Sequence, residues 1–298
     1  MNAPAKPIPI IDTHIHLFDP RRPQGVPWPP KGDSVLYHAA SLNRYREVTK
    51  DLGVVGVIEV ECSPWLEDNQ WVLDVAAKDP IVVGIVGNLE PEKPDFQKHL
   101  ERFHGDPLFL GIRCGNLWGR NLGQQLANPD FVSGLKALAD VGLELDMANP
   151  DPALLQAVVR LTDRVPHLRI VIDHLPQLKP DDRRAANASL QELGRRSQVL
   201  VKLSEVLRRV NDEVPLHVDF YRVWLDEIFG IFGEDRLLYG SDWPNSDRWG
   251  SYPEVLRIVR EYFTNKRPHV MEKFFWKNSI SAYRWIKRDA SQPSTSLF

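Results

Sequence analysis

Cysteine is scarce in this sequence, whose 298 residues include only Cys62 and Cys114. Two thiols are too few for a disulfide framework in a chain of this length, so we expect both to be reduced. Long apolar runs are also missing, and none reaches the ~20 residues that a membrane-spanning helix needs. The segment 1–7 lacks the apolar centre of a secretory signal. These absences favour a cytoplasmic protein that does not act in a membrane.

An excess of charge of either sign is absent as well. The chain has 37 Lys and Arg against 40 Asp and Glu, a formal net charge of −3. Nucleic acids and anionic membrane surfaces are usually bound by clustered basic charge, so neither is an expected partner. We expect a small-molecule substrate instead. The composition leaves the oligomeric state open, and a homo-oligomer is one possibility.

Short apolar runs alternate with amphipathic stretches along the whole chain. The runs are rich in Val, Ile and Leu and almost continuous, as in strands buried on both faces of a parallel sheet. We expect strands at 8–14, 54–61, 81–88, 109–114, 143–147, 169–174, 199–203 and 237–241. We expect helices at 42–52, 66–78, 96–103, 130–141, 153–164, 183–197, 221–229 and 253–263.

Eight strand–helix units predict an α/β fold, a (β/α)₈ barrel that forms a single domain over residues 1–298. A doubly wound open sheet is the alternative, but the chain lacks its glycine-rich phosphate-binding motif. The aromatic segment 270–285 follows the eighth unit. It predicts an extra C-terminal helix that packs across the barrel.

The sequence Asp12-Thr13-His14-Ile15-His16 ends the first predicted strand. Side chains at i and i+2 of a strand point to the same side, so the two histidines face one point. Imidazole is the commonest protein metal ligand, although an isolated His-X-His pair often arises by chance. A matching acid, Asp242, follows the eighth predicted strand.

Ionisable side chains end most of the other predicted strands. Because such groups are rarely buried, their repeated position predicts an active site at the carboxyl ends of the strands. An arginine there can hold a substrate carboxylate in a bidentate pair, or it can pair with a neighbouring glutamate. Likewise, an acid or lysine there can form an internal ion pair, and a tryptophan can serve packing alone. With these alternatives open, the candidate substrate contacts are Arg113, Glu61, Trp28, Trp243, Tyr37 and Lys202.

The ordered set of motifs resembles the amidohydrolase superfamily, over nearly the whole chain. It comprises 12–16, Val171-Ile172-Asp173-His174-Leu175-Pro176, Val201-Lys202-Leu203-Ser204 and Tyr239-Gly240-Ser241-Asp242-Trp243-Pro244. Within the superfamily it looks most like the branch that contains sugar-acid lactonases and lactonases of aromatic-acid degradation.

The resemblance implies a catalytic site with one divalent ion, for which zinc is the favoured metal. His14, His16, His174 and Asp242 would be its ligands, Asp242 would also act as the general base, and His174 would join it in catalysis. Many superfamily members bridge two metals with a Lys or Glu on the fourth strand, where this chain has Arg113, so a second ion is not expected. Some lactonases of the branch use no metal, and a metal-independent site stays open as an alternative for this chain.

The activity that these residues imply is the hydrolysis of a lactone of a sugar acid or another small carboxylated compound. One alternative is a non-oxidative decarboxylase of an aromatic acid, since related barrels combine the same histidine pair with the same acid. A second alternative is a barrel that binds a ligand without catalysis. The predicted specificity loops, 19–40 and 116–128, contain no motif that identifies the substrate.

Overall fold

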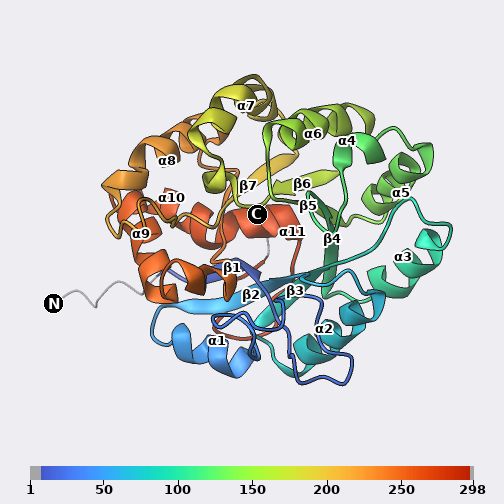
Figure 1. Ribbon diagram of the computed structural model, residues 1–298, viewed down its shortest axis with the longest axis horizontal. Helices are drawn as coiled ribbons and strands as arrows, with labels where there is room; N and C mark the ends of the chain where they lie inside the picture. The colour runs from blue at the N-terminus through green and yellow to red at the C-terminus, as the bar shows by residue number, and fades with distance from the viewer. Residues whose placement is uncertain (1–7, 296–298) are drawn as a thin grey trace.

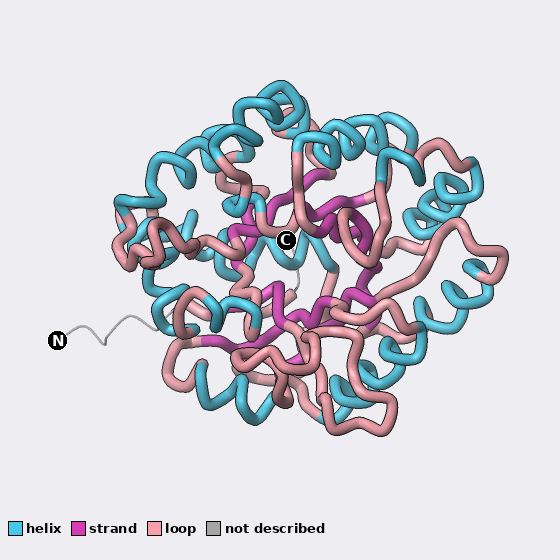
Figure 2. The backbone as a smooth tube through the Cα atoms, in the orientation of Figure 1, coloured by secondary structure: helices cyan, strands magenta, loops and turns pink. Residues whose placement is uncertain are grey.

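Eight parallel strands form the inner wall of the protein in a computed structural model, which describes residues 8–295. They are hydrogen-bonded in chain order, and each of the eight predicted strands is confirmed to within two or three residues at its ends. Figure 2 shows them as a ring inside the helices. The strands are β1 (Ile10–Ile15), β2 (Val54–Val60), β3 (Val82–Gly87), β4 (Phe109–Gly115), β5 (Glu144–Ala148), β6 (Arg169–Ile172), β7 (Val199–Leu203) and β8 (Leu237–Tyr239).

The first and last strands meet and close the sheet. The Asp242 amide donates to the His14 carbonyl at 2.8 Å, and the His16 amide donates to the Trp243 carbonyl at 2.8 Å. The Thr13 hydroxyl adds a bond of 2.7 Å to the carbonyl of Tyr239. The predicted (β/α)₈ barrel is therefore confirmed.

Amphipathic helices surround the barrel and cover the outer faces of the strands (Figure 1). All eight predicted helices are present. One short helix in the loop after β4 was not predicted; Asn121 caps it by accepting a hydrogen bond from the amide of Gln124 at 3.0 Å. The helices are α1 (Leu42–Val48), α2 (Leu66–Lys78), α3 (Phe96–His104), α4 (Leu122–Gln125), α5 (Pro129–Asp140), α6 (Pro152–Arg164), α7 (Pro180–Leu193), α8 (Asp219–Phe232) and α9 (Tyr252–Thr264).

The predicted extra helix is a bent helical segment that closes the amino-terminal end of the barrel. It consists of α10 (Pro268–Glu272), a π-helical turn η3 (Lys273–Lys277) and α11 (Asn278–Tyr283). In Figure 1, α11 lies across the middle of the strand ring. Its residues and Trp285 share one buried cluster with inward-facing strand residues such as Ile11 and Leu110. The amino-terminal end of the barrel is thus filled by packed side chains.

Within residues 8–295, no helix has the length and apolar character needed to cross a membrane. Cys62 and Cys114 are buried free thiols, as predicted. The features predicted for residues 1–7 lie outside the described part of the chain. The single domain over residues 1–298, the cytoplasmic location and the oligomeric state stay predictions.

Candidate active site

A pocket of about 350 Å³ opens at the carboxyl ends of the strands. This is the end at which (β/α)₈ enzymes place their catalytic groups. Its volume suits a single small ring with substituents. The lining residues are His16, Trp28, Cys62, Arg113, Asn116, Leu117, Trp118, Asn149, His174, Glu205, Asp242 and Asn245.

Three histidines converge on one oxygen of Asp242. Its Oδ1 lies 3.4 Å from Nε2 of His14, 3.1 Å from Nε2 of His16 and 3.9 Å from Nε2 of His174. All four residues are at most 5% exposed. The structure therefore brings together the four residues that the sequence predicted as ligands.

The far side of each imidazole ring is held by a neighbouring group. Nδ1 of His16 lies 2.7 Å from the carbonyl oxygen of Val60. A carbonyl oxygen can only accept a hydrogen bond, so this Nδ1 carries the proton and is the donor. Nδ1 of His174 lies 2.9 Å from the Ser204 hydroxyl. Contacts of this kind fix the ring orientation and the tautomer of metal-binding histidines.

The protonation of the histidines also suits a metal site. Burial lowers the pKa of His14 well below its usual value, and the nearby ammonium of Lys202 lowers it further. Burial likewise lowers the pKa of His174 to about 4. A neutral imidazole ring is the form that binds a metal ion.

One divalent ion fits this arrangement. Ligand atoms of His14, His174 and Asp242 all lie within 4.8 Å of one another, and Nε2 of His16 lies 3.1 Å from the same oxygen of Asp242. Nε2 of His14 is buried and has no hydrogen-bond partner among the described residues. A buried polar atom without a partner is costly, and a metal ion would satisfy it.

A second group of possible ligands, made up of His14, Asp146 and Asp173, already surrounds a cation. The Lys202 ammonium lies 2.5 Å from Asp146 Oδ2, 2.9 Å from Asp173 Oδ1 and 3.3 Å from Nδ1 of His14. The two carboxylates raise the pKa of Lys202 against the opposing effect of burial. Lys202 therefore supplies the positive charge that balances the carboxylates of Asp146 and Asp173.

The second oxygen of Asp242 faces another part of the pocket. Its Oδ2 accepts a hydrogen bond from Nδ2 of Asn245 at 2.7 Å. Burial alone would raise the pKa of Asp242, but His174 and the other histidines reverse the effect and hold it below its usual value. Asp242 is thus an ionised carboxylate with one oxygen among the imidazoles and the other beside the Asn245 amide.

Arg113 lines the pocket, yet its donors are engaged by the protein. Its Nε donates to Asp173 at 2.9 Å, Nη1 donates to the Glu61 carbonyl at 3.3 Å, and Nη2 lies 3.2 Å from Nε2 of His174. Of the two predicted roles for Arg113, the structure has the ion pair within the barrel. Its partner is Asp173, in place of the expected glutamate. These contacts hold Asp173 and His174 in place.

The other predicted substrate contacts separate into two groups. Trp28 lines the pocket, with its ring 5.5 Å from that of His16. Trp243 and Lys202 are 0% exposed and do not reach the pocket surface, so the predicted contacts are corrected for both. Trp243 packs against Tyr45 instead, with ring centres 5.3 Å apart. Tyr37 is also absent from the lining of this pocket.

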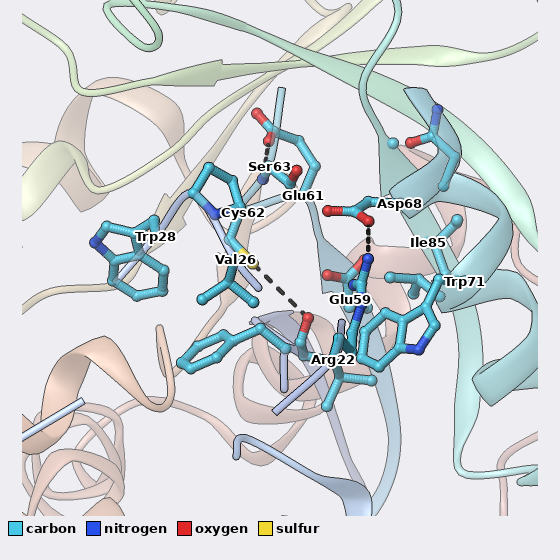
Figure 3. A pocket seen from close by; sticks show the side chains of 16 residues that line it. Arg22, Val26, Trp28, Glu59, Glu61, Cys62, Ser63, Asp68, Trp71 and Ile85 are labelled. Carbon is cyan, nitrogen blue, oxygen red and sulfur yellow. Dashed lines mark hydrogen bonds and ion pairs between the residues drawn. The ribbon is translucent and has the colours of Figure 1, made fainter. Parts of the chain in front are cut away.

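Glu61 lines a neighbouring narrow cavity of about 20 Å³, together with Glu59, which shares its face of β2 (Figure 3). Its carboxylate accepts bonds from the Ser63 amide at 2.9 Å and from Nε1 of Trp118 at 3.2 Å. Cys62 and Trp28 line both spaces and so lie between them. Glu61 therefore does not line the main pocket, where a substrate contact was predicted. Instead, it accepts a hydrogen bond from Trp118, which does line that pocket.

Five polar or aromatic lining residues are not among the predicted substrate contacts. Each lies on a loop that follows a strand, where the apolar pattern that identifies strands gives no signal. Several have a left-handed backbone, which is uncommon outside glycine and concentrates at functional sites. The five are Asn116, Trp118 (φ 57°), Asn149 (φ 53°), Glu205 (φ 49°) and Asn245.

Comparison with known proteins agrees with the fold. A family model described as amidohydrolase matches residues 11–285. The L-fucono-1,5-lactonase of Burkholderia ambifaria is 30% identical and aligns over 81% of this chain and 82% of its own. A crystal structure of an amidohydrolase from Burkholderia multivorans with bound zinc superposes with a TM-score of 0.81 at 20% identity, covering 93% of this chain and 99% of the other. A probable 2-pyrone-4,6-dicarboxylic acid hydrolase from Acinetobacter baumannii has a TM-score of 0.72 at 18% identity, with coverages of 93% and 99%.

Proposed function

Because this chain belongs to the amidohydrolase family, we propose that it is a lactonase that hydrolyses the cyclic ester of a sugar acid. The observation that carries the proposal is the placement of Asp242. One carboxylate oxygen lies among three imidazole nitrogens, and the other faces the pocket beside Asn245. A base beside a candidate metal centre at the mouth of a barrel suits the attack of water on a carbonyl.

The charge of the pocket favours a substrate without carboxylates. Arg113 is the only Lys or Arg among the described residues that line it, and its donors already bind protein groups. A dicarboxylate would need free cationic partners, because a carboxylate is costly to bury unpaired. The three lining asparagines and Glu205 instead suit hydroxyl groups. The similarity to an L-fucono-1,5-lactonase supports the same class, a neutral polyhydroxylated lactone.

The chemistry assigned to the chain's own residues is a proton transfer at Asp242. Its carboxylate accepts a proton from water as the water oxygen bonds to the lactone carbonyl carbon. The bond between that carbon and the ring oxygen then breaks, and Asp242 returns the proton to the departing ring oxygen. The product is the open-chain hydroxy acid.

We assign zinc as the ion that His14, His16, His174 and Asp242 would hold. Three imidazole nitrogens and one carboxylate oxygen are typical zinc ligands. When bound, the ion supplies a Lewis acid for the ester carbonyl. Ser204 and Val60 then serve as the groups that keep the imidazoles turned toward it.

Trp28 and Trp118 are assigned as the apolar walls that pack against the faces of the lactone ring. Both side chains are partly exposed and both line the pocket. Arg113 is assigned a positioning role, since it holds Asp173 and His174. Tryptophan faces bind the apolar C–H faces of sugar rings, whereas hydroxyl groups at the ring edge bind polar side chains.

The test is proton release by the purified protein near neutral pH with a panel of compounds. The panel contains aldono-1,5- and aldono-1,4-lactones, L-fucono-1,5-lactone among them, and 2-pyrone-4,6-dicarboxylate. The same reactions with Asp242→Asn measure spontaneous hydrolysis. We expect a neutral sugar lactone to give a kcat/KM of about 10⁴ M⁻¹s⁻¹ or more, absent in the variant.

Three results would overturn the proposal. A clear preference for the dicarboxylate would contradict the assignment of a neutral substrate. Release of carbon dioxide from hydroxybenzoates, with no lactone hydrolysed, would favour the predicted alternative of a decarboxylase. Binding of sugar lactones without turnover would favour the other predicted alternative, a non-catalytic barrel.

A further inference from the structure

Glu205 is a pocket residue that the proposed chemistry does not use. It follows β7 and has a left-handed backbone with φ 49°. Its side chain lines the pocket together with Asp242 and Asn245. A non-glycine residue held in this conformation costs free energy, so its position needs a reason.

The amide of Asn245 connects Glu205 to the base. Its Nδ2 donates to Glu205 Oε1 at 2.8 Å and to Asp242 Oδ2 at 2.7 Å. Its Oδ1 accepts from Nε of Arg248 at 3.3 Å, which fixes the direction of the amide. Arg248 in turn forms an ion pair with Asp33 of the loop after β1. Glu205 is thus anchored beside the reacting centre by a chain of polar contacts.

Glu205 forms no ion pair with a lysine, arginine or histidine among residues 8–295. A carboxyl group in a pocket without a cationic partner favours ligands that bring hydrogen-bond donors. Hydroxyl groups of a polyol are such donors. Substrate carboxylates are acceptors at neutral pH, and the ionised Asp242, which shares the Asn245 amide with Glu205, would oppose their binding.

We propose that Glu205, oriented by Asn245, is the specificity-determining residue that accepts a hydrogen bond from a hydroxyl of the lactone ring. The inference rests on the proposed lactonase function and defines its substrate class more narrowly. Glu205 selects polyhydroxylated rings over unsubstituted rings and over carboxylated rings.

The test compares a polyhydroxylated 1,5-lactone with δ-valerolactone, which has the same ring without hydroxyl groups. The measured quantity is the ratio of the two kcat/KM values in the unaltered protein, in Glu205→Gln and in Glu205→Ala. Loss of one partner of a buried hydrogen bond is costly enough that Glu205→Ala should lower this ratio about 10- to 100-fold. Glu205→Gln keeps the shape and an acceptor oxygen, so its effect should be smaller. Glu213→Gln, an exposed carboxyl-to-amide change in the same loop, is the matched control and should leave the ratio unchanged.

A second measurement tests Glu205 independently of turnover. A polyhydroxylated lactam, which resists hydrolysis, is titrated into each protein in a calorimeter, and thermal melting confirms that each variant is folded. We expect Glu205→Ala to raise the lactam Kd about 10- to 100-fold. An unchanged ratio or an unchanged Kd would overturn the inference, as would an equal loss on both lactones, which would indicate a role in the chemistry. If the unaltered protein hydrolyses no lactone but Glu205→Ala weakens lactam binding, the proposed function fails and the recognition role stands.

Discussion

The main-chain nitrogen of Asp242 lies 2.8 Å from the carbonyl oxygen of His14. This bond closes the barrel between the segments after β8 and within β1, and it also joins the proposed base to a proposed metal ligand. Closure of the fold and assembly of the site are therefore one structural event. Substitutions where β1 meets the segment after β8 should therefore affect both the stability of the barrel and the geometry of the site.

Asp242→Asn keeps the size of the side chain and removes the proton acceptor. We expect kcat to fall about 10²- to 10⁴-fold, because this is the contribution of a positioned general base. The main-chain bond to His14 does not depend on the carboxylate. Steady-state kinetics measure the loss, and an unchanged melting temperature would show that the fold is intact. Turnover equal to that of the unaltered protein would remove Asp242 from the mechanism.

Removal of metal by a chelator should abolish activity, and one equivalent of zinc should restore it. Elemental analysis is expected to find about one ion per chain, since His14, His16, His174 and Asp242 are proposed as one ligand set around one oxygen of Asp242. His174→Ala should reduce the metal content, whereas His167→Ala, an exposed histidine after α6, should not. Full activity in protein free of metal would instead support the metal-independent alternative left open by the sequence.

Gly240→Ala should damage the site without replacing any of the proposed metal ligands. A Cβ at this position would lie 2.8 Å from Cβ of His14, closer than atoms of two side chains can approach. We expect destabilisation of about 1–3 kcal/mol from overpacking and about a 10- to 100-fold loss of metal affinity as His14 moves. Denaturant unfolding and metal titration measure the two effects.

Gly230→Ala is the matched control for this substitution. Gly230 lies within α8, and no atom lies within 4 Å of the added Cβ. A glycine-to-alanine change in a helix should stabilise the protein by about 0.5–1 kcal/mol. Similar behaviour of the two variants would show that the contact between Gly240 and His14 has no special importance.

Lys202→Met should destabilise the protein strongly. The substitution leaves Asp146 and Asp173 buried without the ammonium that lies 2.5 Å and 2.9 Å from them. Loss of one partner from a buried ionic group costs about 3–5 kcal/mol. Urea unfolding checks this value against Lys98→Met, an exposed lysine whose loss should change stability by about 0.5 kcal/mol or less. A cost below about 1 kcal/mol for Lys202→Met would contradict the assigned role.

The fold and the centre of the candidate site could be predicted because each has a local sequence signal. Buried parallel strands appear as short continuous runs of Val, Ile and Leu, and all eight were found. His14 and His16 are two residues apart in an extended segment, so their shared direction follows from strand geometry alone. The structure places both beside Asp242.

The walls of the pocket could not be predicted, because strand ends and loops follow no simple period. Trp243 is adjacent to Asp242, but the left-handed backbone of Asp242 (φ 60°) lies outside the extended pattern of β8, and Trp243 packs on Tyr45 outside the pocket. Lys202 shares β7 with the site yet is buried in the barrel below it. Glu205 and Asn245 face the pocket through a left-handed turn and a loop amide, neither of which has a periodic signature.

The bond between His16 and Asp242 joins residues 226 positions apart in the chain. A ribosome that adds 5–20 residues per second needs roughly 10 to 45 seconds to produce the second after the first. Throughout that interval the histidine pair of the nascent chain exists without its acid, and β1 has no β8 to close upon. The candidate site of this protein can therefore be assembled only late in its own synthesis.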